Sequence, residues 1–397
     1  MLSGRVGRSR GIDAQRPLRE WLAVSRPTVS WADWAEFELA EIRAAGRWRS
    51  NRTFDARGAI GELDGRAVVS FASNDYLGLA THPAVQAAAR EAIDRWGTGS
   101  TASRLIVGSR PCHDELEVEI ADWKHTEKAI LFPTGYSANV GVLGVVGGPD
   151  VTVFSDELNH ASIIDGCRLS RSQVSVYRHC DLEQLGHLLN TTNGRAVVVS
   201  DSVFSMDGDV APVQALGELC ARHGALLILD EAHAVLGPHG PEPIDGLDVI
   251  RVGTLSKTLG SLGGWAAAAA PLVDVVVNRA RSYIFTTALS PADTAAGLAA
   301  LRIVRSTEGS LLIDRLRTIV DRVSRNHPSP IIPIILGDEG VAVEASASLL
   351  EQGILVPAIR PPTVPAGTSR LRIALSAGHD DEMVERLIAA LADLGLR

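Results

Sequence analysis

The sequence predicts an α/β protein whose larger domain is a mostly parallel β-sheet with helices on both faces. Three observations predict this class. Short apolar runs alternate with segments of helical periodicity. These runs are continuously apolar, which is typical of strands buried on both faces. Polar residues follow almost every run. The chain has 397 residues, of which 46% are hydrophobic and 21% charged, so we expect a soluble protein with more than one domain.

The expected strands are the apolar runs, and the expected helices are the periodic segments between them. The strands are predicted at residues 66–71, 129–132, 151–155, 173–178, 195–200, 225–230 and 248–252. An apolar run over residues 265–270 also suits a buried strand. Helices are predicted at residues 31–48, 83–96, 113–124, 134–146, 182–189 and 213–223, and residues 272–320 are helical by period.

Prolines suggest a second domain near the C-terminus. Pro328, Pro330 and Pro333 precede a mixed segment with strand patterns at residues 331–336 and 370–375 and helix patterns at residues 341–352 and 380–394. We therefore predict an N-terminal arm and helix over residues 1–65, a large domain over residues 66–296, and a small α+β domain over residues 297–397.

Charge and composition argue against several classes of protein. The net charge of -9 does not favour nucleic-acid binding, and no run of about 20 apolar residues predicts a membrane span. The N-terminal residues lack the apolar core of a signal peptide. None of the four cysteines forms a C-x-x-C pair or zinc-finger spacing. We therefore predict a cytoplasmic protein with reduced cysteines and no metal.

Polar residues after the strands indicate where chemistry occurs, because ligands bind beyond the carboxyl ends of parallel strands. The lysine among them is unusual, since the chain has only three lysines, Lys124, Lys128 and Lys257. Lys257 lies in a Gly/Ser/Thr-rich segment. An amine can attack a carbonyl, whereas a guanidinium cannot. Taken alone, an ordinary loop lysine is an equally good interpretation.

The other strand-end residues suit one aldehyde cofactor. Asp230 could hold a pyridine nitrogen in its protonated form, and His160 and His233 could stack on or hydrogen-bond to an aromatic ring. The segment Thr134-Gly135-Tyr136 begins a helix and could bind phosphate, and Thr254 adds a hydroxyl group beside the lysine. With a lysine that can form a Schiff base, these are the groups that pyridoxal 5′-phosphate needs.

Each residue also has an alternative interpretation. Asp230 with Glu231 could cap a helix, and His160 could be a polar loop residue. The sequence Asp-Glu-Ala-His also occurs in helicases, but those need a G-x-x-x-x-G-K-[ST] loop, which this chain lacks.

Seven motifs in order resemble the α-oxoamine synthases, which are pyridoxal-phosphate enzymes of fold type I. The motifs are Ser73-Asn-Asp-Tyr-Leu-Gly-Leu79, Thr134-Gly-Tyr-Ser-Ala-Asn139, Asn159-His-Ala-Ser162, Val203-Phe-Ser-Met-Asp-Gly208, Asp230-Glu-Ala-His233, Thr254-Leu-Ser-Lys257 with Gly263-Gly264, and Arg360-Pro-Pro-Thr-Val-Pro-Ala-Gly-Thr-Ser-Arg-Leu-Arg372. The resemblance implies the fold type I architecture and pyridoxal 5′-phosphate as cofactor.

The resemblance implies roles for individual residues around the cofactor. Lys257 would hold the cofactor and later move the α-proton of the substrate, and Asp230 would pair with the pyridine nitrogen. His160 would stack on the ring. The remaining cofactor contacts would come from His233 and Ser205 at the ring hydroxyl and from Gly135, Tyr136 and Thr254 around the phosphate.

The resemblance also implies substrate contacts and a homodimer with shared active sites. Asn74 and Arg372 would hold the amino-acid carboxylate, and Thr363 would line the substrate site. Arg47 is the N-terminal arginine we expect to contact the acyl substrate, with Arg49 nearly as good. The segment that would reach the phosphate of the neighbouring subunit contains Thr286 and Thr287.

The implied reaction is a decarboxylative condensation of an amino acid with an acyl thioester. Within the family, the stretch over residues 361–368 indicates L-alanine and a pimeloyl thioester of biotin biosynthesis, carried by coenzyme A or a carrier protein. Other family members stay open as alternatives, namely glycine C-acetyltransferase, 5-aminolevulinate synthase, serine palmitoyltransferase and secondary-metabolite relatives. A pyridoxal-phosphate aminotransferase or lyase is a more distant alternative.

Overall fold

The computed structural model describes residues 30–396, and the chain divides into two compact units, Met1–Thr53 and Phe54–Arg397. The described part of the first unit contains helix α2 (Trp31–Ala44). Ser30 and Asp33 form a capping box at its start, which satisfies two backbone N–H groups that the helix leaves unpaired. Across the described residues, none of the helices is both long and apolar enough to cross a membrane.

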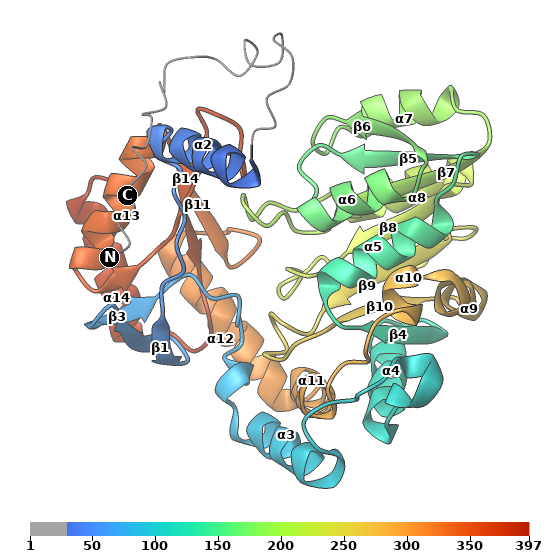
Figure 1. The fold of residues 1–397 in the computed structure, drawn as a ribbon, viewed down its shortest axis with the longest axis horizontal. Helices are drawn as coiled ribbons and strands as arrows, with labels where there is room; N and C mark the ends of the chain where they lie inside the picture. The colour runs from blue at the N-terminus through green and yellow to red at the C-terminus, as the bar shows by residue number, and fades with distance from the viewer. Residues whose placement is uncertain (1–29, 397) are drawn as a thin grey trace, which may run out of the picture. The chain divides into compact units, whose positions relative to one another are not determined.

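The largest sheet of the second unit has seven strands (Figure 1). Its strand order is β4 (Lys128–Phe132), β10 (Gly264–Ala268), β9 (Val249–Thr254), β8 (Leu226–Asp230), β7 (Arg195–Asp201), β5 (Val151–Asp156) and β6 (Gln173–Tyr177). The five strands from β9 to β6 are parallel, whereas β10 runs antiparallel to both of its neighbours. The predicted α/β class with a mostly parallel sheet is confirmed.

Alternate residues of the strands enter different cores, as expected for a sheet covered on both faces. In β7, Val197 and Val199 belong to one cluster of buried residues, and Val198 belongs to another. Helices α5 (Gly135–Val146), α6 (Ala161–Leu169) and α9 (Ala270–Arg279) pack on the first side. Helices α7 (Leu182–Asn190) and α8 (Val213–His223) pack on the second. Figure 1 shows α5 and α6 together on one face of the sheet.

The second unit also contains two smaller sheets. One combines strands of residues 54–70 with a strand near the C-terminus, and the other consists of C-terminal strands only. One sheet has the order β1 (Phe54–Arg57), β2 (Ile60–Leu63), β3 (Arg66–Ser70), β12 (Ile354–Leu355), and the other β11 (Ile331–Gly337), β14 (Ser369–Ala374), β13 (Ala358–Ile359). Helices α13 (Glu339–Glu351) and α14 (Asp381–Asp393) accompany them. The parallel pairing of β12 with β3 brings two distant segments into one sheet. The predicted division at residues 65/66 and 296/297 stays a prediction.

Seven further helices complete the described part of the second unit. They are η1 (Leu79–Thr81), α3 (Pro83–Trp96), the π-helix η2 (Arg104–Gly108), α4 (Pro111–Trp123), α10 (Arg281–Ile284), α11 (Pro291–Val304) and α12 (Thr307–Val323).

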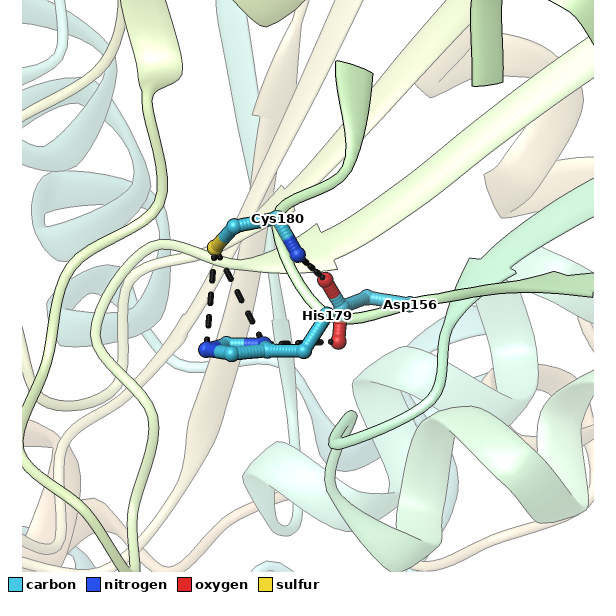
Figure 2. A group of neighbouring side chains, drawn as sticks. All are labelled: Asp156, His179 and Cys180. Carbon is cyan, nitrogen blue, oxygen red and sulfur yellow. Dashed lines mark hydrogen bonds and ion pairs between the residues drawn. The ribbon is translucent and has the colours of Figure 1, made fainter. Parts of the chain in front are cut away.

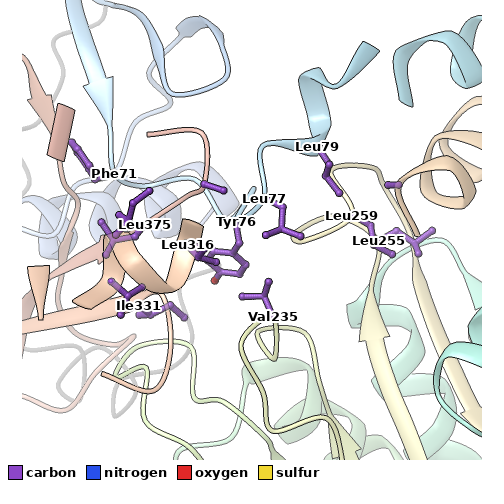
Figure 3. Close-up of a cluster of buried hydrophobic side chains, with 14 of the residues drawn as sticks. Phe71, Tyr76, Leu77, Leu79, Val235, Leu255, Leu259, Leu316, Ile331 and Leu375 are labelled. Carbon is purple, nitrogen blue, oxygen red and sulfur yellow. The ribbon is translucent and has the colours of Figure 1, made fainter. Parts of the chain in front are cut away.

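One hydrophobic cluster anchors the loop that carries Lys257 (Figure 3). Leu255 and Leu259 lie two residues on either side of the lysine, and both are almost fully buried. They belong to the same cluster as Val235, Leu316 and Ile331, so segments from four parts of the chain pack together. Burying leucine side chains stabilises by about 1.5–3 kcal/mol each. The loop is therefore held by apolar side chains on both sides of its polar centre.

Candidate active site

A cavity of about 210 Å³ lies where the carboxyl ends of β7, β8 and β9 meet the first turn of α5. It is lined by seven of the residues that the sequence predicted for a cofactor site, namely Gly135, Tyr136, His160, Asp230, His233, Thr254 and Lys257. These residues come from four separate segments of the chain. The expectation that strand ends converge on one site therefore holds for this sheet.

Lys257 provides an amine that is easier to deprotonate than an exposed lysine. Burial lowers its pKa, and the Arg372 guanidinium acts in the same direction, while the carboxylates of Asp230 and Asp201 oppose the shift. A lowered pKa leaves more of the amine in the neutral form that attacks a carbonyl. The lysine is thus suited to a covalent link with an aldehyde.

A chain of hydrogen bonds leads away from Lys257. Its Nζ lies 2.7 Å from His233 Nε2, and His233 Nδ1 lies 2.6 Å from the hydroxyl of Tyr76. The Tyr76 hydroxyl donates to Asn74 Oδ1 at 3.1 Å, so His233 Nδ1 donates to Tyr76 and His233 Nε2 accepts from the lysine. Burial holds the pKa of His233 well below its usual value, with Lys257 and Arg372 acting in the same direction. A neutral His233 is consistent with this direction of donors.

The same chain continues to the C-terminal part. Arg372 Nη2 donates to Asn74 Oδ1 at 3.1 Å, and Arg372 Nε donates to the backbone oxygen of Ser205 at 2.5 Å. The structure therefore brings Asn74, Arg372 and Ser205 together, although they do not line the cavity itself, and their roles stay predictions. Burial raises the pKa of Tyr76 to about 12, so the phenol keeps its proton at neutral pH.

Asp230 is held rigidly at the base of the cavity. Its Oδ2 accepts from Asn139 Nδ2 at 2.6 Å, and its Oδ1 accepts from the backbone N–H of Ala232 at 2.9 Å. Asn139 Nδ2 also donates to Ser162 Oγ at 2.9 Å. Asn139 Oδ1 is buried without a hydrogen-bond partner in the described part of the chain. A buried polar atom without a partner on the cavity wall fits a site that completes its contacts with a bound group.

His160 stands at the first turn of α6 and is fixed by the strand beside it. Its backbone N–H donates to Asp201 Oδ2 at 2.7 Å, and the preceding Asn159 Oδ1 accepts from the backbone N–H of Asp201 at 2.9 Å. The imidazole Nδ1 lies 2.8 Å from Ser162 Oγ. Burial lowers the pKa of His160, which favours a neutral ring that can lie against an aromatic group.

The first turn of α5 forms a cradle for an anion. The first N–H groups of a helix have no intrahelical partners and attract phosphate. Thr134 caps only the N–H of Ser137, at 3.0 Å. A Cβ atom at Gly135 would lie 3.2 Å from Cβ of Thr254, so a side chain there would crowd the approach. Together with the lysine and Asp230, this cradle fits pyridoxal 5′-phosphate.

Besides Asn74, Ser205 and Arg372, four more predicted site residues lie away from this cavity or cannot be placed against it. Thr286 and Thr287 follow α10, and Thr363 lies exposed in the loop before β14. No contact between these three residues and the cavity is described for residues 30–396. Arg47 lies in the unit Met1–Thr53, whose position relative to the cavity is not determined. Their roles stay predictions.

The structure adds three residues that the sequence did not single out. Tyr76 and Asn139 lie inside two of the family motifs, and Asp201 directly follows the predicted strand at residues 195–200. The strand-end rule would have found Asp201 if the strand had been followed to its last residue. Tyr76 and Asn139 gave no separate signal, because a buried aromatic residue and a single polar residue in a helix also occur without any functional role.

A group of possible metal ligands lies outside the cavity, formed by Asp156, His179 and Cys180 (Figure 2). His179 Nδ1 lies 3.0 Å from Asp156 Oδ1, and His179 Nε2 lies 2.6 Å from Asp209 Oδ2. These hydrogen bonds to Asp156 and Asp209 raise the pKa of His179 to about 12. An imidazolium that donates from both nitrogens has no lone pair for a metal. We interpret the group as a charged link between the end of β5 and the loop after β7.

A larger cavity of about 330 Å³ lies beside the first and shares Ala232 and Thr254 with it. Its polar wall contains Lys124, whose Nζ donates to Glu231 Oε2 at 2.7 Å and lies 3.4 Å from the centre of the Trp123 ring. Glu231 also accepts from Arg251. Lys124, Glu231 and Arg251 neutralise one another, so this larger cavity offers no free charged group of its own among these three. The smaller cavity therefore remains the candidate active site.

The chain matches known proteins over most of its length. The profile of the family "Aminotransferase class I and II" matches residues 66–391. A protein of Anaeromyxobacter dehalogenans named 8-amino-7-oxononanoate synthase is 49% identical, covering 91% of this chain and 95% of that protein. A protein of the same name from Geobacter sulfurreducens is 44% identical over 90% of this chain and 97% of its own length.

Solved structures share the fold of this chain. The serine palmitoyltransferase of Sphingomonas wittichii superposes with a TM-score of 0.83 at 31% identity, covering 93% of this chain and 98% of that one. A structure described as SPT with a PLP internal aldimine superposes with a TM-score of 0.85 at 28% identity, covering 94% and 100% of the two chains. An 8-amino-7-oxononanoate synthase of Francisella tularensis shares the fold, with a TM-score of 0.69 at 24% identity over 83% of this chain and 98% of that one.

Proposed function

The chain belongs to the aminotransferase class I and II family and, within it, to the 8-amino-7-oxononanoate synthases, and we propose that it joins L-alanine to a pimeloyl thioester. The products would be 8-amino-7-oxononanoate, carbon dioxide and the free thiol. It is a pyridoxal-phosphate-dependent acyltransferase, and its substrates are an amino acid and an acyl thioester. The observation that carries the proposal is the convergence of Lys257, His233 and Asp230 on one cavity.

Pyridoxal 5′-phosphate, when bound, supplies an aldehyde for the amino group and a ring that accepts electrons from the α-carbon of the substrate. We assign its contacts to residues that line the cavity. Lys257 Nζ would bind the aldehyde carbon, and the carboxylate of Asp230 would pair with the ring nitrogen. The imidazole of His160 would stack on one face of the ring. The N–H groups at the start of α5 and the hydroxyl of Thr254 would hold the phosphate.

The hydrogen-bond chain gives Lys257 a means to exchange protons. His233 Nε2 accepts from Lys257 Nζ, and His233 Nδ1 donates toward Tyr76. In this arrangement the lysine would remove the α-proton of the amino acid and later return one to the product. His233 would keep the amine oriented, and we also assign it, with Ser205, to the ring hydroxyl.

Arg372 and Asn74 support a site for the amino-acid carboxylate. The Arg372 guanidinium is almost fully buried, and its Nη2 is held at Asn74 Oδ1. A buried guanidinium is suited to a two-point contact with a carboxylate. Thr363 and Arg47 are proposed to contact the acyl substrate, and the donor would be coenzyme A or a carrier protein.

A homodimer with shared active sites is the second part of the proposal. Three consecutive apolar residues of η2, namely Leu105, Ile106 and Val107, are exposed, and so is Phe285 after α10. Residues of η2 and α10 lie in contact, and the backbone N–H of Ala288 donates to the oxygen of Ala102. An exposed apolar patch next to Thr286 and Thr287 supports the expectation that these threonines reach a second copy.

All four cysteines are unpaired, which supports a cytoplasmic location.

The experiment begins with an absorbance spectrum of the purified protein and of the protein with added pyridoxal phosphate. A band near about 410–430 nm is expected from the lysine-bound cofactor. Lys257→Ala should lose both this band and turnover. Lys128→Ala is the matched control, because Lys128 is exposed and pairs with Asp274 at the surface. An unchanged band in Lys257→Ala would refute the assignment.

Substrate tests then separate the relatives. Thiol release from pimeloyl-CoA is measured with L-alanine, glycine and L-serine in parallel. Preference for alanine supports the proposal. Preference for serine with a long-chain thioester would instead favour a serine palmitoyltransferase, the name of a structure that superposes closely. Preference for glycine would favour another α-oxoamine synthase.

A further inference from the structure

Two carboxyl groups face the candidate site side by side. Asp201 is the last residue of β7 and Asp230 the last residue of β8, and the two are paired in the register of these parallel strands. Both line the cavity, and their exposed fractions are only 2% and 5%. The proposed function uses Asp230 and leaves Asp201 without a role.

The two carboxyl groups have different hydrogen-bond surroundings. Both oxygens of Asp230 accept from N–H donors, one from Asn139 and one from Ala232. In Asp201, Oδ2 accepts from the backbone N–H of His160, and within residues 30–396 no donor is described for Oδ1. A carboxyl proton needs an oxygen that is not already facing a donor. Asp201 Oδ1 is therefore the oxygen of the pair that can carry one.

The other charged groups around Asp201 are Asp230, Asp156 and Lys257. Burial and the neighbouring Asp230 raise the pKa of Asp201 well above its usual value, and Asp156 at the end of β5 acts in the same direction. The backbone N–H of His160 and the amine of Lys257 oppose this shift. Burial also lowers the pKa of the Lys257 amine, so less of it carries a positive charge. Two carboxylates in one buried site therefore lack enough positive charge to ionise together.

A pyridinium ring changes this balance. Its protonated nitrogen is a cation that would lie against Asp230. An added positive charge stabilises the ionised form of every carboxyl group near it, including the neighbour of Asp230. The site would then tolerate two negative charges.

We propose that Asp201 and Asp230 form a carboxyl pair that holds one proton in the apoenzyme and releases it when the pyridinium ring of the cofactor binds. The O–H bond of the Asp201 carboxyl group breaks, its electron pair stays on the oxygen, and the proton leaves to the solvent. Asp201 is thus a positioning residue, which fixes His160 through the backbone and matches the charge of the site to a cationic ring. The inference rests on the proposed cofactor contacts.

The test counts protons upon binding. The probe is pyridoxine 5′-phosphate, which has a hydroxymethyl group in place of the aldehyde and so cannot form a covalent link with Lys257. Calorimetric titrations of the apoenzyme in buffers of different ionisation enthalpy give the number of protons exchanged per site. Asp201→Asn keeps an oxygen for the N–H of His160 but removes the acid. The wild type should release about one proton more than this variant at pH values around neutrality.

The control is Glu117→Gln, because Glu117 is a largely buried carboxylate that pairs with Arg104 and does not line the cavity. It should give the wild-type proton count. A difference below about 0.3 proton between the wild type and Asp201→Asn would overturn the proposal. An equal decrease in the number of released protons in both variants would overturn it as well, because any buried carboxylate would then have the same effect.

Infrared difference spectra of the wild type provide a second measurement that does not depend on a variant. Loss of a protonated carboxyl band upon addition of the probe supports the pair, and an unchanged band overturns it. If the wild type neither binds the probe nor shows an absorbance band with pyridoxal phosphate, the proposed cofactor contacts are wrong. If the absorbance band is normal but the wild type and Asp201→Asn release the same number of protons, only the proposed carboxyl pair is wrong.

Discussion

Substitution of Glu231 tests whether the buried ion pairs next to Asp230 stabilise the site. It follows Asp230 directly, its side chain is fully buried, and it accepts from both Lys124 and Arg251. Burial alone would raise its pKa, but these two cations lower it below its usual value. Glu231→Gln has the same shape, yet its amide NH₂ must face one of the two cationic donors. The substitution therefore leaves buried positive charge without a counterion.

The expected loss of stability is large. Removing one partner of a buried ion pair costs about 3–5 kcal/mol, which is a large part of the roughly 5–15 kcal/mol that stabilises a typical domain. Unfolding in urea is measured by tryptophan fluorescence at fixed protein concentration. Two of the seven tryptophans lie beside this network, because Lys124 Nζ lies 3.4 Å from the Trp123 ring centre and 5.2 Å from that of Trp265.

Two variants control this prediction. Glu115→Gln breaks an exposed pair with Arg302 and should cost only about 0.5 kcal/mol. Lys124→Met combined with Glu231→Gln removes one of the cations and should recover part of the loss, because charges within one network are coupled. A loss below about 1 kcal/mol in Glu231→Gln would show that the buried charges are not isolated from water.

Three further predictions concern the site and its supports. Tyr76→Phe removes the hydroxyl that His233 contacts, so kcat should fall about tenfold while the absorbance band stays, measured by steady-state kinetics. Gly135→Ala places a Cβ atom 3.2 Å from that of Thr254, and cofactor affinity should fall about tenfold in equilibrium dialysis. The raised pKa of His179 contributes stability fully below pH 6.5 and loses it as the pH rises toward about 12, so the stability gap to His179→Gln should narrow in alkaline urea titrations.

Each of these three predictions can fail in a distinct way. A normal kcat in Tyr76→Phe would mean that the hydroxyl does not support the proton chain. Wild-type affinity in Gly135→Ala would place the phosphate elsewhere. A gap between the wild type and His179→Gln that stays constant with pH would mean that His179 is neutral in the folded protein.

Much of the fold was predictable because its strands are buried on both faces. Such strands appear as continuous apolar runs, and the predicted runs at residues 151–155, 195–200 and 225–230 agree with β5, β7 and β8 within one residue at each end. The reversed direction of β10 was not predicted, since an apolar run has no sign of strand direction. The short strands β1 and β2 were also missed, because they are largely exposed and only four residues long.

The sequence by itself determined which chemistry was available. Lys257, Asp230 and His233 follow apolar runs, and parallel strands bring their carboxyl ends to one edge. Only the tertiary structure decided which groups touch. The contact of Asp201 with His160, the path from Lys257 to Arg372, and the burial of Lys124 against Glu231 all join residues far apart in the chain. Local pattern records what each residue prefers, whereas hydrogen bonds and burial depend on neighbours that only folding brings together.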